Sequence, residues 1–490
     1  MVCTIFTMFD GGGLTYFIVD IILLLTIIFG VVVVILENKN PIKAISWILI
    51  IIFLPIIGFI LYLYFGRNFR KNKFFNRKVV SDAISFDLLI DHQLVELDRK
   101  KFLKNEKLKP KRHIMKLLLN NNRALVTENN HVKVLNNGKE TFSSIIYEME
   151  NAIDSINLEY YIIEDDKIGN KIKNILIRKA KEGLTVNVIF DDIGSWSLSR
   201  KFILALRMAG VEVKSFMPVK TYFFANKVNF RNHRKIIVVD GKIGFVGGLN
   251  IADRYLRNGK SNLWRDIHLR IEGDAVRSLQ TVFLMDWYFV AGKVLDVKKY
   301  FPELRVKGHR LIQIATSGPD SDWASIMQAF FMAITTARKY VYISTPYFLP
   351  NTSIMTALKT VVMSGIDVIL ILPEKPDSFM IRLSSQSYIE ELLEVGVKVY
   401  YYHKGYTHSK LIIVDDVFSS VGTANMDIRS FNQNFEVNAL IYDEEIATEL
   451  KNGFLDDLKH SYIVSYENFT NKSTIRRFIE SVARLFSPLL

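Results

Sequence analysis

Two stretches of the chain decide its fold: RNHRKIIVVDGKIGFVGGLN at 231–250 and THSKLIIVDDVFSSVGTAN at 407–425. In each, a His-x-Lys pair precedes an apolar, β-branched run that ends at an Asp, and a Gly and an Asn follow. The matched pairs are His233 and His408, Lys235 and Lys410, Asp240 and Asp415, Gly247 and Gly422, and Asn250 and Asn425, all 175 positions apart. Five matches in one register indicate an internal duplication.

The duplication extends beyond these motifs. GLTVNVIFDD at 183–192 matches GIDVILILPE at 365–374, and AGVEV at 209–213 matches VGVKV at 395–399. Each is a Gly-bounded apolar run after a helix-like stretch, so strands alternate with helices. We therefore expect an α/β protein with two duplicated sandwich domains, at 131–300 and 301–465, packed around one active site.

Two long apolar runs open the chain. Leu14–Leu36 and Ile42–Phe65 each contain one charged residue, and each exceeds the ~20 residues that cross a bilayer as a helix. A signal peptide followed by a core helix is the weaker alternative, because a signal peptide has a shorter apolar region and a positive start. The pattern predicts a two-helix transmembrane hairpin within residues 1–66.

Charge predicts the orientation of this hairpin. Residues 1–13 contain no Lys or Arg, whereas 67–78 contain six basic residues and no acidic one. Positive flanks remain in the cytoplasm, so we expect a multi-pass protein of the cytoplasmic membrane with both termini and the catalytic domains inside. Residues 67–130 are then a basic juxtamembrane linker that also attracts anionic lipid.

Composition narrows the function classes. Apolar residues make up 49% and charged residues 23% of the chain, which excludes a disordered protein. One cysteine excludes an intramolecular disulfide and a cysteine-based zinc site. A net charge of +13 favours an anionic partner, which is a nucleic acid, a phosphorylated substrate or an acidic membrane.

The motif residues suit phosphoryl chemistry. Residues i and i+2 of a strand share a face, so the His and Lys of each copy point the same way. A lysine holds an anionic oxygen and the asparagines Asn250 and Asn425 add amide donors. One neutral imidazole can attack phosphorus while the other, protonated, serves the leaving oxygen. The motifs lack the carboxylate cluster that Mg²⁺ or Ca²⁺ needs, so we expect no metal and no cofactor.

Each catalytic imidazole also needs a carboxylate to orient it. Asp240 and Asp415 complete the two motifs and count among the catalytic candidates, but they lie beyond the apolar run and favour a turn-anchoring position. Asp266 in NLWRDIHL and Glu436 in FNQNFEVNAL follow the respective motifs and are the better candidates for orienting the histidines.

Residues 466–490 form a predicted amphipathic helix. Phe478, Ile479, Val482, Leu485, Phe486 and Leu489 fall on one helical face. This face either docks on the protein core or lies in the lipid interface.

The doubled His-x-Lys-x₄-Asp motif resembles that of the phospholipase D superfamily. The membrane segment NPIKAISWILIIIFLPIIGFILYLYFGRN and the ending ARLFSPLL are similar to those of bacterial cardiolipin synthases, although Gly-Gly-Leu-Asn and Gly-Thr-Ala-Asn replace a frequent Gly-Ser. The resemblance implies a covalent phosphohistidine on His233, with His408 as acid and base. It also implies phosphate binding by Lys235, Lys410, Asn250 and Asn425, and Asp266 and Glu436 as acidic partners.

The resemblance further implies that phosphatidylglycerol and anionic membrane lipid are the partners rather than nucleic acid. The oligomeric state stays open. Two other functions remain: hydrolysis at the same site, as in a phospholipase D or a tethered nuclease, and a non-catalytic lipid-binding scaffold. Both motifs are intact, which disfavours the scaffold.

Overall fold

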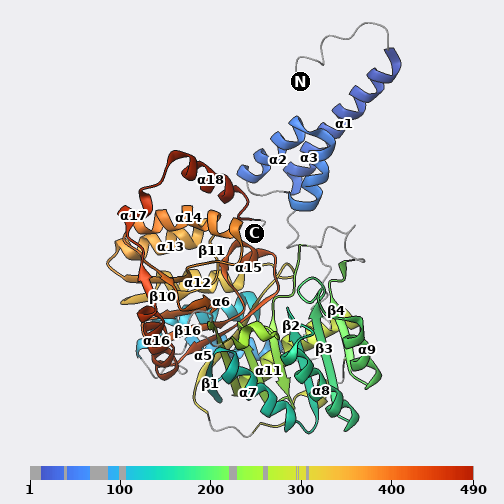
Figure 1. The fold of residues 1–490 in the computed structure, drawn as a ribbon, viewed down its shortest axis with the longest axis vertical. Coiled ribbons are helices and arrows are strands. Elements are labelled where there is room, and N and C mark those ends of the chain that lie inside the picture. Colours follow the sequence, from blue (N-terminus) through green and yellow to red (C-terminus); the bar gives the residue numbers. More distant parts are fainter. Residues whose placement is uncertain are drawn as a thin grey trace. The chain divides into compact units, whose positions relative to one another are not determined.

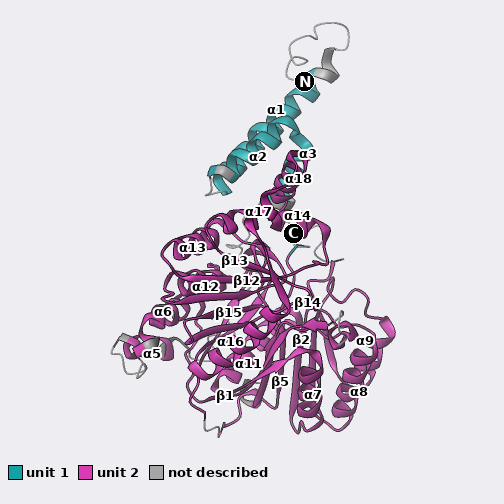
Figure 2. Cartoon of the chain, turned by 60° about the vertical axis from the view of Figure 1, so that its left-hand side comes forward, with its two compact units in different colours: residues 1–72, 220–229 teal, residues 73–219, 230–490 magenta. Residues whose placement is uncertain are grey.

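The computed structural model describes residues 13–37, 41–66, 86–98, 106–219, 229–257, 263–293, 295, 297–304 and 308–488. The chain forms two compact units (Figure 2). Unit 1 is 1–72 with 220–229, and unit 2 is 73–219 with 230–490.

Unit 1 is helical. Its elements are α1 (Gly13–Glu37), α2 (Pro41–Phe53), α3 (Pro55–Leu61) and the π-helical η2 (Tyr62–Gly66). Helix α1 packs against both α2 and α3 around a small core of Val34, Ala44, Ile51 and Tyr62. Within the described residues, one helix, over Phe17–Glu37, is long and apolar enough to cross a membrane.

The second apolar run differs from the expectation of one continuous helix over 42–65. It is divided at Leu54, whose φ of −135° and ψ of 71° are not helical. Pro55 explains the break, because proline disfavours helical geometry at the residue before it and cannot donate to the preceding turn. The basic run 67–78 and residues 1–12 lie outside the described residues.

Unit 2 contains the two α/β repeats (Figure 1). Their sheets have the same strand order. The first sheet is β1-β8-β6-β5-β2-β3-β4, and the second is β9-β18-β16-β15-β10-β12-β13 with β19 added at its end. Strands β3 and β12 are the matched Gly-bounded runs, and so are β4 and β13. The expected duplicated α/β architecture is thereby confirmed.

The elements of the first repeat are β1 (Asn130–Asn136), α7 (Asn137–Glu150), β2 (Ser155–Tyr160), α8 (Lys167–Lys181), β3 (Thr185–Asp191), α9 (Arg200–Met208), β4 (Glu212–Phe216), β5 (Lys235–Val239), β6 (Ile243–Gly247), η5 (Asp253–Leu256), β7 (Leu263–Arg265), β8 (Ile267–Gly273), α11 (Asp274–Ala291) and η6 (Val297–Tyr300).

Those of the second are β9 (Leu311–Ser317), α12 (Ser325–Thr335), β10 (Tyr340–Ser344), β11 (Phe348–Leu349), α13 (Thr352–Met363), β12 (Asp367–Pro373), α14 (Phe379–Glu394), β13 (Lys398–Tyr402), β14 (Gly405–Thr407), β15 (Leu411–Val414), β16 (Phe418–Gly422), β17 (Met426–Asp427), α15 (Ile428–Asn432), β18 (Glu436–Tyr442), α16 (Glu444–Lys459) and β19 (Ser461–Ile463).

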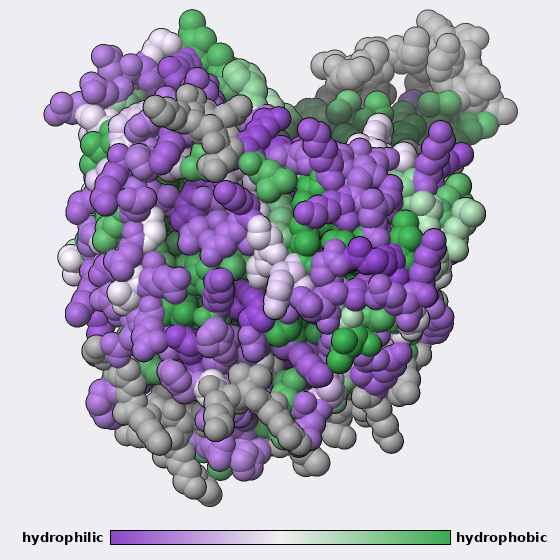
Figure 3. Space-filling view, turned by 60° about the horizontal axis from the view of Figure 1, so that its bottom comes forward, coloured by the Kyte–Doolittle hydropathy of each residue, from purple (hydrophilic) through white to green (hydrophobic). Residues whose placement is uncertain are grey.

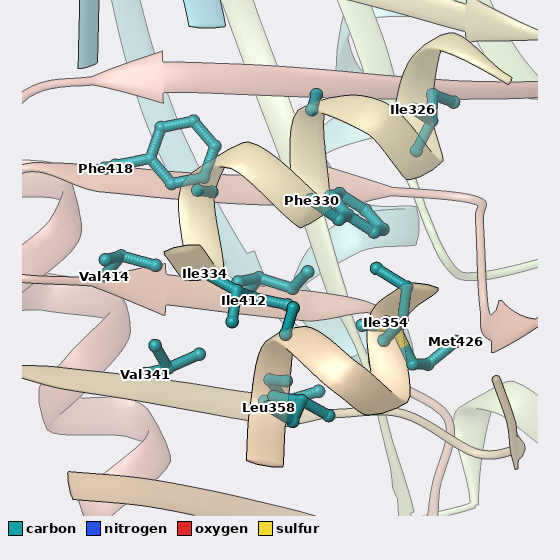
Figure 4. Close-up of a cluster of buried hydrophobic side chains, with 14 of the residues drawn as sticks. Ile326, Phe330, Ile334, Val341, Ile354, Leu358, Ile412, Val414, Phe418 and Met426 are labelled. Atoms are coloured by element: carbon teal, nitrogen blue, oxygen red, sulfur yellow. The ribbon is translucent and has the colours of Figure 1, made fainter. Parts of the chain in front are cut away.

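The motif strands bury both of their faces. In β5, Ile236 and Val238 join an apolar cluster shared by the two sheets, which also contains Ile413 of β15. Ile237 faces the opposite way, into a cluster with residues of α7, α8 and α9. Figure 4 shows the corresponding outer core of the second repeat, where α12 and α13 cover β10 and β15. This alternation is the period of a strand buried on both sides, and the shared cluster joins the repeats into one unit.

The described part of 67–130, the predicted juxtamembrane linker, is helical. It forms α5 (Phe86–Asp98), the 3₁₀ turn η4 (Glu106–Lys111) and α6 (Arg112–Asn122). Ile114, Met115 and Leu118 of α6 are buried in the outer core of the second repeat, because α6 carries an apolar face that packs on α12.

Candidate active site

Two backbone contacts bind the repeats together beside the motif histidines. Strand β14 pairs with β7 so that Thr407 faces Arg265, and the His408 N–H donates to the Arg265 carbonyl at 2.7 Å. An isolated bridge joins Asn232 to Phe435, and the His233 N–H donates to the Phe435 carbonyl at 2.9 Å. Glu436 follows Phe435 and Asp266 follows Arg265 in the chain. Each histidine therefore lies close to a carboxylate of the other repeat.

The carboxylates orient the imidazoles across the repeats. Nδ1 of His233 lies 2.9 Å from Oε2 of Glu436, and Nδ1 of His408 lies 2.8 Å from Oδ2 of Asp266. Both carboxylates are fully buried. The sequence singled out both acids but gave no sign of the exchange between repeats, because the pairing depends on how the two sheets pack.

The lysines lie beside the histidines, as the strand geometry predicted. Each ammonium donates to the carbonyl of its own histidine at 2.7 Å, Lys235 to His233 and Lys410 to His408. The Lys410 ammonium also lies 3.0 Å from Nδ1 of the His408 ring. Burial lowers the pKa of Lys235 to about 7 and that of Lys410 to about 8. Both amino groups are buried, and the charge of Lys410 also lowers the pKa of Lys235. An anionic ligand beside them would favour their charged forms.

Both imidazoles are neutral in the free protein. Burial, helped by the nearby charge of Lys235, lowers the pKa of His233 to about 4 against the opposing effect of Glu436. Burial and the adjacent Lys410 hold the pKa of His408 well below its usual range. Because a carboxylate only accepts hydrogen bonds, Nδ1 of His233 carries the proton and Nε2 keeps its lone pair.

The two acids differ in their protonation. Burial alone would raise the pKa of Glu436, but His233 and Lys235 more than offset this and hold the pKa below its usual value. For Asp266 burial prevails and raises the pKa to about 6, against the effect of Lys410. Glu436 is therefore the more firmly charged of the two acids.

The residue after each motif glycine explains the departure from Gly-Ser. A side chain at Gly248 would place its Cβ 2.2 Å from Oδ1 of Asp266, so only glycine fits there. In the second repeat the equivalent Thr423 donates its hydroxyl to Oε2 of Glu436 at 2.5 Å. At this position, the glycine of the first repeat leaves space for Asp266, whereas the threonine of the second repeat hydrogen-bonds Glu436.

The two asparagines are fixed within their own repeats. The side chain of Asn250 donates to the Tyr255 hydroxyl at 2.6 Å and accepts from the Ile162 N–H. Asn425 hydrogen-bonds Asp427 through its side chain, while its Oδ1 is buried without a hydrogen-bond partner. The rings of Tyr255 and His408 are 6.0 Å apart, so Asn250 lies one aromatic side chain away from the second imidazole.

Asp240 and Asp415 do not reach the imidazoles. Asp240 accepts hydrogen bonds from the backbone N–H groups of Ile153, Asp154 and Ser155. Asp415 accepts equivalent bonds from 338–340. Both adopt positive φ, 52° and 57°, at the far end of the motif strand from the histidine. These contacts are those of side chains that anchor a turn, and they leave both acids without a contact to either imidazole in the described residues.

Aromatic rings that the sequence did not single out enclose the histidines. Tyr161 meets His233 edge-on with ring centroids 4.9 Å apart, and Trp264 lies 5.6 Å from His408. Glu159 accepts a hydrogen bond from Asn232 and so braces the backbone before His233. In the sequence, the one indication that Trp264 belongs to the site is its position two residues before Asp266.

In the parts of the chain that the structure describes, no group of three or more His, Cys, Asp or Glu side chains could hold a metal ion. The lysines supply the positive charge that a phosphate needs. The arrangement combines two oriented, neutral imidazoles with two buried lysines. Such a set of groups suits phosphoryl transfer in two steps.

Comparison with known proteins agrees with this chemistry. The family described as "Cardiolipin synthase, PLD-like domain" matches residues 145–287 and 330–458, and "Phospholipase_D-nuclease N-terminal" matches 14–67. The chain is 44% identical to a cardiolipin synthase of Geobacillus sp. (strain WCH70), over 98% of this chain and 94% of that protein. It is 40% identical to the major cardiolipin synthase of Bacillus subtilis, over 95% and 98%.

Among solved structures, the phosphatidylserine synthase of Haemophilus influenzae Rd KW20 matches with a TM-score of 0.58 and 15% identity. The match covers 77% of this chain and 98% of that chain, and it supports the doubled α/β fold. The full-length similarity and the paired site lead to one conclusion: the chain belongs to the cardiolipin synthases of the phospholipase D superfamily, which are phosphatidyltransferases.

Proposed function

We propose that the protein transfers a phosphatidyl group from one phosphatidylglycerol to another, giving cardiolipin and glycerol. The observation that carries the proposal is the exchanged pairing of His233 with Glu436 and His408 with Asp266, with Lys235 and Lys410 beside them. Such a site can hold one phosphodiester between two imidazoles of different function.

In the first step, Nε2 of His233 attacks phosphorus and the bond from phosphorus to the glycerol headgroup oxygen breaks. His408 gives its proton to that oxygen, and glycerol leaves. The pKa of His408 in the free protein is far too low for this task, because burial and Lys410 disfavour the cation. The negative charge of the bound phosphodiester offsets the lysines and raises the pKa when the acid is needed.

In the second step, the terminal hydroxyl of another phosphatidylglycerol attacks the phosphohistidine. Its proton passes to His408, the phosphorus–nitrogen bond breaks, and the electron pair returns to Nε2 of His233. Lys235 and Lys410 stabilise the charge on the phosphoryl oxygens, which is the main electrostatic task in such transfers. Asn250 and Asn425 are proposed as amide donors to the same oxygens.

We also propose a membrane arrangement and a division of the chain. α1 and the pair α2–α3 form a hairpin in the cytoplasmic membrane, and both catalytic repeats, 131–300 and 301–465, lie on the cytoplasmic side. Packing of α1 on α2 and α3 and the six basic residues at 67–78 support this orientation. In a Cys3→Ser background, a cysteine at position 470 should resist an impermeant thiol reagent in intact cells, and one at position 38 should react.

Product analysis tests the reaction. Purified protein in phosphatidylglycerol membranes, with labelled lipid and excess chelator, should form cardiolipin and glycerol in equal amounts. Phosphatidic acid as the main product would replace the proposal with hydrolysis. The absence of any product, also after divalent ions are restored, would leave a lipid-binding scaffold.

A further inference from the structure

The C-terminal helix α18 (Thr474–Leu485) follows the short α17 (Tyr466–Thr470). A helix that docks on an apolar core buries its apolar side, but α18 leaves that side exposed. Its buried residues are Glu480 and Ala483. Its large apolar side chains are exposed: Ile475 by 73%, Phe478 by 68% and Leu485 by 77%. Ile479, Val482 and Phe486 continue this exposed face.

Polar contacts, not apolar burial, hold α18 on α14. Arg484 pairs with Glu391, and Arg477 lies 3.5 Å from Glu390. The hydroxyls of Ser487 and Ser384 hydrogen-bond at 2.6 Å. Because the helix docks through its polar side, its apolar side faces away from α14.

The charge of the outward surface of α18 is positive. Glu480, its one acidic residue, is only 2% exposed and is paired with Lys472 at 2.8 Å and with Arg476. Arg476, Arg477 and Arg484 keep from about a third to more than half of their side chains exposed. An apolar face flanked by exposed arginines is the pattern of a helix that lies in an anionic lipid interface.

The end of α18 is linked to the segment that leads to Glu436. The Pro488 carbonyl, three residues after the helix, accepts a hydrogen bond from Gln433 at 3.0 Å. Gln433 directly precedes Asn434, whose amide lies 3.4 Å from Oε1 of Glu436. A surface that contacts lipid through α18 would therefore hold the partner of His233 close to the membrane.

We propose that α18 is an in-plane membrane helix. Its "α18 apolar face" (Ile475, Phe478, Ile479, Val482, Leu485 and Phe486) is buried in the lipid interface and holds the segment before Glu436 near the membrane. Such helices sit about 5–10 Å into the boundary between headgroups and acyl chains. Figure 3 shows another face of the protein, where hydrophilic side chains predominate.

Lipid-dependent quenching tests this inference on the full-length chain. In a Cys3→Ser background, Phe478→Cys is labelled with an environment-sensitive dye and placed in single-copy nanodiscs that contain nitroxide lipids. Ser481→Cys is the matched control, because Ser481 is exposed on the same helix but lies outside the α18 apolar face. The expected result is a blue-shifted emission and several-fold stronger quenching at 478 than at 481.

Equal, weak quenching at both positions with water-like emission would overturn the inference. So would a label at 478 that is shielded from iodide yet not quenched by nitroxide lipid, because another part of the chain would then cover the face. Shielding that arises only in discs with two copies would assign the face to self-association instead. These measurements need no turnover, so their failure is separate from a failure of the proposed reaction.

A functional readout accompanies the labelling. Phe478→Ser with Leu485→Ser should lower kcat/KM for lipid in vesicles several-fold and lower it much less for a soluble short-chain phosphodiester. Equal losses on both substrates would show a structural defect and contradict the inference. Arg477→Gln, which leaves the apolar face intact, is the control for changes in packing on α14.

Discussion

Nδ1 of His233 lies 2.9 Å from Oε2 of Glu436, although 203 residues separate the two in the chain. The reciprocal pair, His408 and Asp266, is separated by 142 residues. Because each acid belongs to the other repeat, neither repeat holds an oriented imidazole by itself. The duplication therefore yields one site, built at the contact between the repeats.

Glu436→Gln should slow formation of the phosphohistidine by about 10³–10⁴-fold, as the amide partner favours the wrong tautomer. The measurement is the rate of adduct formation from a phosphodiester with an activated leaving group. Asp266→Asn is the matched control, because it acts on the imidazole that serves the leaving group. It should impair turnover of the natural lipid and spare the adduct from the activated substrate. Equal loss of the adduct in both variants would contradict the assignment.

Thr423→Val should lower kcat by roughly 10–100-fold, since a hydrogen bond to a charged group contributes about 1.5–3 kcal/mol. Thr423→Ser keeps the hydroxyl that reaches Glu436 and should retain most of the activity. KM should change little in either variant, because the hydroxyl touches the acid and not the lipid. If the valine variant matched the wild type, the hydroxyl would have no positioning role.

The fall of kcat/KM at alkaline pH should reflect deprotonation of Lys235 and Lys410. Their pKa values of about 7 for Lys235 and about 8 for Lys410 are below the usual lysine value because burial disfavours the ammonium. As pH rises through this window the ammoniums lose protons and with them their charge for phosphate, so activity falls. kcat/KM reports the free enzyme. Lys410→Arg keeps its charge at all relevant pH values and should shift the limb upward if it folds.

An alkaline limb in Lys410→Arg that is identical to the wild-type limb would exclude Lys410 as its source. As pH falls, Asp266 is protonated first, near its pKa of about 6. His233 loses its nucleophilic lone pair only near its pKa of about 4. The acidic limb of kcat/KM should therefore extend down to about pH 4. The profile is then bell-shaped and belongs to the coupled groups together.

Asp240→Ala should lower the free energy of unfolding by about 1–3 kcal/mol, because backbone donors at 153–155 lose their acceptor. Asp415→Ala should cost more, because it also removes the carboxylate partner of the buried Lys111 ammonium. Activity per folded molecule should stay close to that of the wild type, since neither acid reaches an imidazole. Thermal unfolding and titration of active sites check this. Full stability with loss of turnover would restore the catalytic assignment.

Local patterns carried most of the fold. The Gly-bounded runs at 183 and 365 became β3 and β12, and the alternation in β5 and β15 followed from their apolar residues. Local patterns do not reveal long-range contacts: α6, within the predicted linker 67–130, packs on α12. Pro55 is a local sequence signal for the break at Leu54. The prediction of one helix over 42–65 gave more weight to the length of the apolar run.

The candidate site divides in the same way. His233, Lys235, His408 and Lys410 share a face because strands alternate, which any reader of the motif can deduce. The exchange of Asp266 and Glu436 between repeats depends on the register of β7 with β14, which no local pattern encodes. The different tasks of Gly248 and Thr423 could be understood only after the acids were located.

Trapping the covalent intermediate tests the central claim most directly. The full-length protein in lipid membranes is treated with an activated phosphodiester, quenched at alkaline pH, and mapped by mass spectrometry; His233→Ala is the control. The account predicts a phosphatidyl adduct on His233, retained in His408→Ala and absent from the control. An adduct on His408, or cardiolipin formation with an adduct on neither histidine, would contradict it.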